Sequence, residues 1–347
     1  MIDFSASEIS QLIIHSVGNK TNDDICKFSK SSIAPSDEIK SLLLHYFVTP
    51  FKSEEYYNLY HETDLSLNEI YSFVSEIFQT PTSFFNQSIN IVKHLYERSI
   101  HPKIKNGECY IVHFRNCRIN NENVDAIGLF KSENKDTFLK VFSSCSNFEI
   151  ESEKGININK LDKGCVIFNI EKDAGYLVTI VDNINKGVEA KYWTDDFLRV
   201  KPRQDEYHDT QKVISLLKNY INKELPNEFE VSKIDQALFL NKGINALKNN
   251  ASFNIKEFTE EVFSDPNVIQ SFEKYKDSYI QERDIILKES FVISEQALKK
   301  RAKGKMSTIK LDKNFDIKIH GGEEFIEQGF DQEKKMNFYK LYYKEEN

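Results

Sequence analysis

The sequence predicts an α+β fold with a central antiparallel β-sheet between helical regions. Apolar residues recur at helical spacing before about residue 100 and again after residue 200. Between residues 107 and 183 they form five short runs rich in Val, Ile, Phe and Tyr, separated by short polar segments. Parallel strands need crossovers of a dozen or more residues, so these separators indicate antiparallel strands.

The amino-terminal region should combine one strand with a helical subdomain. The capping-box spacing of Ser5 and Glu8 favours a helix over residues 8–18. However, the apolar run and the Gly-Asn pair that ends it favour a strand, which we adopt. Three segments of helical period follow. Each ends at or near a proline: Pro50, Pro81 and Pro102.

The length of 347 residues exceeds what one hydrophobic core usually serves. We expect three domains: a strand plus helical subdomain over 1–104, an antiparallel sheet domain over 105–200, and a helical region over 201–347. The last region should also carry a basic cluster and a small carboxy-terminal β element, because the final fifty residues alternate like strands.

The charge of the chain excludes one class of DNA-binding protein. The net charge is −8, so a small basic protein that coats DNA through its overall charge is ruled out. Residues 1–100 hold 7 Lys or Arg against 13 Asp or Glu, which makes the amino-terminal part acidic. Any contact with nucleic acid must therefore come from a local patch.

The five cysteines contain no C-x-x-C pair, which suits isolated thiols in a reducing cytosol. No secretory signal and no apolar window of about eighteen residues is evident, so we expect an intracellular, soluble protein without a membrane partner. The sequence also lacks compact metal-ligand spacings and glycine-rich phosphate loops. No metal and no cofactor are expected.

Several single residues are expected to be structural. His15, His45, His94 and His113 lie in apolar runs, where histidines are usually satisfied core or interface groups. The single tryptophan, Trp193, has Tyr192 and Phe197 nearby and is expected to anchor a core. An exposed stacking platform for bases is the alternative for Trp193.

The stretch DAIGLFKSENKDTFLKVF, residues 125–142, has the order of a nuclease motif. Asp125 followed by Glu133 and Lys135 matches PD-(D/E)xK enzymes, in which these side chains hold a metal that activates water. However, Glu133 to Asp136 lies between two apolar runs, and Asn and Asp are turn formers. We therefore interpret residues 133–136 as the tip of a hairpin, assign no catalytic residue, and keep a metal-dependent nuclease as a third hypothesis.

The densest basic cluster lies near the carboxyl end. It consists of Lys299, Lys300, Arg301, Lys303 and Lys305. These side chains could contact DNA phosphates and release counterions. Alternatively, they could be a solvated helix carboxyl end, where cations complement the helix dipole. No helix-turn-helix or zinc finger is evident, so base-specific recognition is not predicted.

Several phrases, taken together, resemble one family. They are HPKIKNGECYIVHF (101–114), DAIGLFKSENKDTFLKV (125–141), GININKLDKGCVIFN (155–169), EAKYWTDDFL (189–198) and GFDQEKKMNFYKLYY (329–343). In order and along nearly the whole chain, they resemble the 37-kDa nucleoid-associated protein family, NdpA. The resemblance implies a bacterial, cytoplasmic protein found with the nucleoid, which binds double-stranded DNA and has a link to chromosome topology or its enzymes.

The main hypothesis is therefore a non-enzymatic, nucleoid-associated protein that binds double-stranded DNA largely without sequence specificity. No residue roles are carried over from the family, and the five basic residues come from the charge pattern alone. The alternative is an adaptor for a DNA-processing enzyme such as a topoisomerase, which the acidic amino-terminal part and the many aromatic residues favour. A homodimer is compatible with the sequence.

Overall fold

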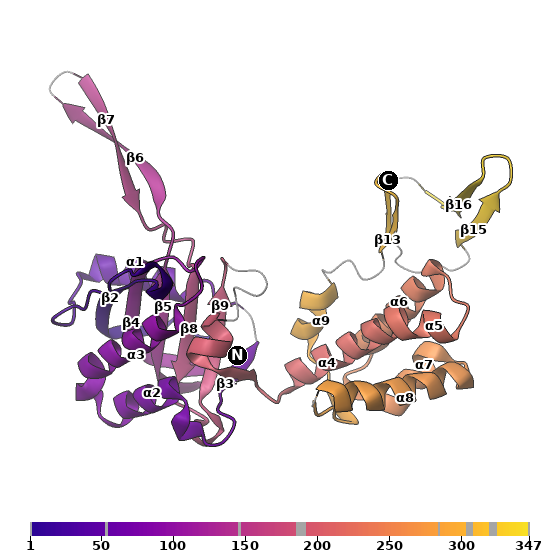
Figure 1. The fold of residues 1–347 in the computed structure, drawn as a ribbon, viewed down its shortest axis with the longest axis horizontal. Coiled ribbons are helices and arrows are strands. Elements are labelled where there is room, and N and C mark those ends of the chain that lie inside the picture. Colours follow the sequence, from indigo (N-terminus) through magenta and orange to yellow (C-terminus); the bar gives the residue numbers. More distant parts are fainter. Residues whose placement is uncertain are drawn as a thin grey trace. The chain divides into compact units, whose positions relative to one another are not determined.

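The computed structural model describes residues 2–52, 55–144, 147–184, 192–283, 285–302, 308–318 and 325–345. The chain forms two compact units, residues 1–203 and 204–347, each of which is described by itself (Figure 1). Helices and antiparallel strands are mixed in the way that the sequence predicts, which confirms the α+β class.

The first unit is built on one curled antiparallel sheet. The strands follow the order β1-β4-β5-β8-β9-β3-β10, and β2 also pairs with β4. The strand predicted over residues 8–18 is confirmed as β2. The strand bounds are β1 Ile2–Asp3, β2 Glu8–Val17, β3 Tyr56–Leu59, β4 Gly107–Ile119, β5 Glu122–Ser132, β8 Lys163–Phe168, β9 Leu177–Asp182 and β10 Val200–Pro202.

Helices cover both faces of this sheet. Cys109 and Ile111 of β4 join the core beneath α2 and α3, whereas Tyr110 and Val112 join the core beneath α1. Successive side chains of a strand point to opposite faces, and both faces are buried here. This explains why the strands are nearly continuous apolar runs. The helix bounds are α1 Asp37–Val48, α2 Glu69–Gln79 and α3 Phe84–Arg98.

Two tight connections follow from their turn residues. Asn120 and Asn121 join β4 to β5 with positive φ angles of 50° and 71°, which asparagine tolerates. Between β8 and β9, Gly175 has a φ of 99°, and a Cβ there would lie 2.0 Å from the carbonyl oxygen of Leu59. The polar separators INNEN and EKDAG are confirmed as turns.

A separate two-stranded hairpin, called the arm (residues 136–155), extends from the first unit (Figure 1). It consists of β6 Asp136–Ser144 and β7 Asn147–Gly155. The expected hairpin tip at residues 133–136 is therefore wrong. These residues lie at the base of the arm, because β5 pairs with β8 and β4 rather than with β6. Alternating apolar residues in TFLKVF predict a strand but do not identify its partner.

The second unit is a helical bundle with short strands. Its core gathers apolar residues of α4, α6, α7 and α8. Gly243 of α6 lets α4 approach closely, since a Cβ there would lie 2.3 Å from a methyl carbon of Leu217. The bounds are α4 Glu206–Asn219, α5 Leu225–Glu228, α6 Lys233–Asn249, α7 Ile255–Phe263, α8 Pro266–Arg283, α9 Glu295–Ala302, β11 Ser252–Asn254 and β12 Ser290–Val292.

Two further hairpins form the carboxy-terminal β element that the sequence predicts. They are β13 Thr308–Leu311 with β14 Phe315–Lys318, and β15 Ile326–Asp331 with β16 Met336–Leu341. Ile309 of β13 is buried in a small apolar cluster with Ile234 and Leu238 of α6. The first hairpin therefore packs one face against α6.

Candidate functional site

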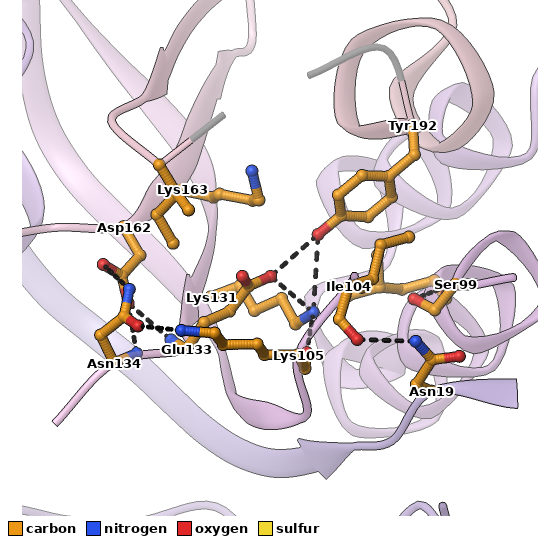
Figure 2. Close-up of polar contacts among 12 residues, drawn as sticks. Asn19, Ser99, Ile104, Lys105, Lys131, Glu133, Asn134, Asp162, Lys163 and Tyr192 are labelled. Carbon is orange, nitrogen blue, oxygen red and sulfur yellow. Dashed lines mark hydrogen bonds and ion pairs between the residues drawn. The ribbon is translucent and has the colours of Figure 1, made fainter. Parts of the chain in front are cut away.

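Glu133 of the nuclease-like stretch lies in a buried polar network with Lys131 and Tyr192 (Figure 2). The Glu133 side chain is 3% exposed, and its Oε1 lies 2.8 Å from Nζ of Lys131, which is fully buried. The hydroxyl group of Tyr192 donates a hydrogen bond to the same carboxylate oxygen, with 3.1 Å between the two oxygens. Lys131 also donates to the carbonyl oxygen of Lys105. The Glu133 carboxylate thus compensates a buried cation.

The sheet register explains why a second lysine joins this network. Lys131 of β5 lies directly opposite Lys163 of β8. Lys163 is also fully buried, and its Nζ lies 2.6 Å from Oδ2 of Asp182. The ring of Tyr192 lies within 6 Å of both ammonium groups. Each buried cation has its own acid, as a charge in a low dielectric requires.

Burial controls the protonation of this network. It lowers the pKa of Lys131, and the nearby Glu133 carboxylate opposes that shift. Burial also raises the pKa of Tyr192, and the same carboxylate raises it further. Tyr192 therefore remains a protonated hydrogen-bond donor rather than a base.

The backbone at the base of the arm is also fixed. The Asp162 carboxylate accepts hydrogen bonds from the backbone N–H of Glu133 and of Asn134, at 2.6 and 2.8 Å. Lys135 pairs with Glu108, with 2.6 Å between Nζ and Oε1. All three residues of the Glu-Asn-Lys segment are thus engaged in holding the junction between sheet and arm.

The nuclease pattern is not assembled. Asp125 precedes Glu133 by eight residues along an extended strand, which separates them by about 25 Å. Its carboxylate instead pairs with Nε2 of His113 over 3.2 Å. Within the described residues, no group of three or more His, Cys, Asp or Glu side chains could hold a metal ion. The geometry gives no support to the nuclease hypothesis.

An open pocket of about 490 Å³ lies beside the network. Most of its charged groups already contact other protein groups: Lys135 pairs with Glu108, and Lys105 donates to the Asn134 side chain. The lining residues are Ser16, Lys105, Asn106, Gly107, Glu108, Ser132, Glu133, Asn134, Lys135 and Lys154. This arrangement supports the base of the arm and leaves little unpaired chemistry for a ligand.

The isolated aromatic and histidine residues are mostly structural, as expected. Trp193 is fully buried and packs against Phe197, so the stacking platform is excluded. His15 and His94 are buried, and their Nε2 atoms lie 2.9 Å from Ser88 Oγ and 3.1 Å from the Phe197 carbonyl oxygen. His113 is likewise buried.

His45 differs from the other three histidines. It is exposed on α1, where its Nε2 lies 3.1 Å from the side-chain oxygen of Asn159. Of the two expected settings, core or interface, His45 does not take the core position, because it lies on the outer side of the helix whose Tyr46 and Phe47 enter the core.

The basic cluster begins in the last turn of α9. Lys299 and Lys300 are exposed there, and Lys299 forms an exposed ion pair with Glu295. Lys303, Lys305 and the side chain of Arg301 lie outside the described residues. The structure therefore describes only the beginning of this cluster.

The lysines continue onto the β13–β14 hairpin. Ile309 and Ile317 pack towards α6, so strand alternation directs Lys310 and Lys318 to the opposite, exposed face. Lys313 is exposed in the turn. The sequence signal for this side of the hairpin is the alternation of isoleucine and lysine. We refer to residues 299–318 as the basic segment.

The family assignment comes from comparison with known families. The chain matches the family model of the nucleoid-associated protein YejK over residues 13–341 of 347. The chain belongs to this family. Family membership confirms the resemblance found in the sequence and assigns the protein to the bacterial nucleoid in the cytoplasm. Proteins of the YejK family are generally non-catalytic.

A search of curated proteins gave no match. Within the described part of the chain, no helix is both long and apolar enough to cross a membrane.

Proposed function

We propose that this member of the YejK family is a non-enzymatic protein that binds double-stranded DNA, largely without sequence preference, through the basic segment. One observation carries the proposal. In a chain of net charge −8, residues 299–318 contain eight Lys or Arg and two acidic residues, Asp312 and Asp316. The chain belongs to a family of nucleoid-associated proteins, and this membership favours DNA as the polyanion that the basic segment binds.

The position of the lysines favours phosphate contact over the helix-dipole explanation. A helix dipole acts within its last turn, which accounts for Lys299 and Lys300. It does not account for Lys310, Lys313 and Lys318, which are exposed on a separate hairpin. Cations that extend beyond the helix onto a neighbouring element suit a DNA backbone, which presents phosphates along its whole length.

The β13–β14 hairpin should also reduce the cost of binding. Packing of Ile309 against α6 fixes the strand on which Lys310 lies. Ordering a lysine on a fixed strand costs less entropy than ordering it on a loose chain. The pair between Lys299 and Glu295 is exposed and therefore weak, so a phosphate could displace the glutamate. Lysine contacts to phosphate position a protein without selecting a sequence.

The test substitutes alanine for Lys310, Lys313 and Lys318 together. Loss of three phosphate contacts should make the log–log slope of affinity against salt shallower by about 2.7. Fluorescence anisotropy of a labelled duplex, at salt concentrations from about 50 to 200 mM, measures this slope. The matched control carries alanine at Lys93, Lys172 and Lys248, which are exposed and change the net charge equally.

A second variant tests the remainder of the basic segment. Alanine at Lys299, Lys300, Arg301, Lys303 and Lys305 should make the slope shallower by about 4.5. Duplexes of unrelated sequence should bind the unchanged protein equally well. If both variants kept the wild-type slope, the basic segment would not be the DNA-binding surface. A partner among DNA-processing enzymes stays a prediction of the sequence.

A further inference from the structure

The arm has two chemically different faces. Its strand register places Leu139, Val141, Phe148 and Ile150 on one face, which we call the apolar face. The opposite face carries Phe138 and Phe142 among charged residues: Asp136, Lys140 and the glutamates at positions 149, 151 and 153. A hairpin in solution would gain nothing from keeping all its large aliphatic side chains on one side unless that side met another surface.

Among the described residues of the first unit, none covers the apolar face. Its four large side chains are 60–79% exposed, with Phe148 the most exposed at 79%. No described residue of the arm belongs to the clusters of buried apolar residues in the described part of the chain. A lone two-stranded hairpin is marginally stable in water, and a contiguous exposed apolar patch usually marks an interaction site.

We propose that the apolar face packs against the same face of a second copy of this chain. Charge complementarity selects this occupant. The apolar face carries no acidic side chain, and its one cation, Lys154, lies near the base opposite Thr137. Its distal part therefore matches another uncharged face. DNA does not fit, because the apolar face offers a single cation and the other face is acidic.

The position of Lys154 also selects the orientation. Two arms packed side by side in the same direction would bring both Lys154 ammonium groups together at their bases. With the arms antiparallel about a two-fold axis, these groups lie at opposite ends, about 26 Å apart. Val141 and Ile150 then lie at the centre, and Phe148 of each copy covers Leu139 of the other. The contact is antiparallel and self-complementary.

The size of the arm makes the dimer weak. Nine residue pairs at about 3.3 Å and two strands about 4.8 Å apart give a face of about 30 by 10 Å, a footprint of about 300 Å². Two such faces bury far less than the roughly 1,200 Å² of standard stable interfaces. The dimer should therefore form reversibly as the protein concentration rises.

Sedimentation velocity across a concentration series tests the proposal. The full chain should shift from monomer towards dimer, and Phe148→Asp with Ile150→Asp should raise the dissociation constant by at least about 100-fold. Circular dichroism should be unchanged, because neither residue joins a core. The control, Glu149→Ala with Glu151→Ala on the opposite face, should leave the dimer intact. A monomer at every concentration, or a dimer that tolerates the aspartates, would overturn the proposal.

Crosslinking separates this arrangement from other dimers. In a Cys145→Ser background, Ile150→Cys should form a disulfide between two copies under mild oxidation, because the two-fold axis brings the two cysteines together. Glu151→Cys, on the opposite face, should not. Equal crosslinking of the two variants, or crosslinking of Glu151→Cys alone, would contradict packing through the apolar face.

Discussion

The arm and the β13–β14 hairpin are both antiparallel pairs of strands, yet their surroundings differ. In the β13–β14 hairpin, Ile309 and Ile317 pack towards α6, and the outward face carries lysines. No described helix of the first unit packs on the arm, and Val141 and Ile150 are exposed. The comparison shows that the side chains a hairpin exposes to solvent depend on which of its faces the rest of the molecule covers. A covered apolar face leaves a charged surface for ligands, whereas an uncovered one needs a partner.

The two hairpins also differ in the sign of their charge. Lys310, Lys313 and Lys318 make the β13–β14 hairpin basic, and this is the basis for the proposed DNA contact. The charged face of the arm is acidic, which would repel DNA but does not oppose association through the apolar face. High salt should therefore weaken DNA binding and spare the dimer, since screening affects exposed charges and not apolar contact.

The largest expected effect of a substitution is at the base of the arm, where a buried and an exposed glutamate can be compared. Glu133→Ala leaves the ammonium group of Lys131 buried without its carboxylate, which should cost about 3–5 kcal/mol of unfolding free energy. Urea unfolding followed by the fluorescence of Trp193, which is buried in the same unit, measures this loss. The control Glu151→Ala, on the exposed face of the arm, should change the free energy by less than about 0.5 kcal/mol. Equal effects of the two substitutions would show that the buried network does not hold the junction.

A smaller effect is expected when one apolar residue in each hairpin is truncated. Ile309→Ala should destabilise the packing on α6 by about 2–4 kcal/mol, because it leaves a cavity beside Ile234 and Leu238. Val141→Ala removes an exposed side chain and should change the stability of the monomer by less than about 0.5 kcal/mol. The protection of the backbone amides of each hairpin from hydrogen exchange measures the effect of both substitutions. Equal loss of protection in the two hairpins would contradict the difference in covering.

The smallest effect concerns acid sensitivity of the first unit. Burial lowers the pKa of His15, His94 and His113. Below about pH 6.5 the unfolded chain therefore takes up protons that the native imidazoles resist, so stability falls as the pH drops from 6.5 towards 5. Asp125 beside His113 and Glu69 beside His94 favour the charged imidazole and so partly oppose the lowering of these two pKa values.

Thermal unfolding monitored by Trp193 fluorescence between about pH 5 and 8 measures the trend, with a plateau expected above about pH 7. His15→Gln should flatten part of the slope. A stability that rose on acidification would show that these imidazoles are more readily protonated in the native state, contrary to their burial.

Much of the fold could be predicted because its signals are local. The antiparallel strands follow from short apolar runs and polar separators, and α1 ends near Pro50 as its sequence indicates. The buried lysines could not be predicted. Lys131 directly follows an apolar run, but nothing nearby in sequence reveals that Tyr192 and Asp182 enclose the site. A charged residue at a strand end is normally expected in water.

The surface that we propose for DNA could be delimited only in part from the sequence. The density of charge indicates the basic residues at and after the end of the helix, residues 299–305, but not the lysines of the β13–β14 hairpin. Which lysines of the β13–β14 hairpin face outward depends on α6, whose residues are some seventy positions earlier. The arm shows the same limit, since the sequence predicted β6 but assigned its beginning to a turn tip.

The sequence by itself determined the period and charge of each segment, because these depend on neighbouring residues. It thus determined most of the strands and helices, with β3 and β7 missed, as well as the family and the basic character of residues 299–318. The tertiary structure alone decided that Glu133 neutralises a buried lysine, that α6 covers one hairpin and that the arm remains uncovered. Burial depends on contacts between residues distant in the chain, and no local pattern encodes which surface will meet another.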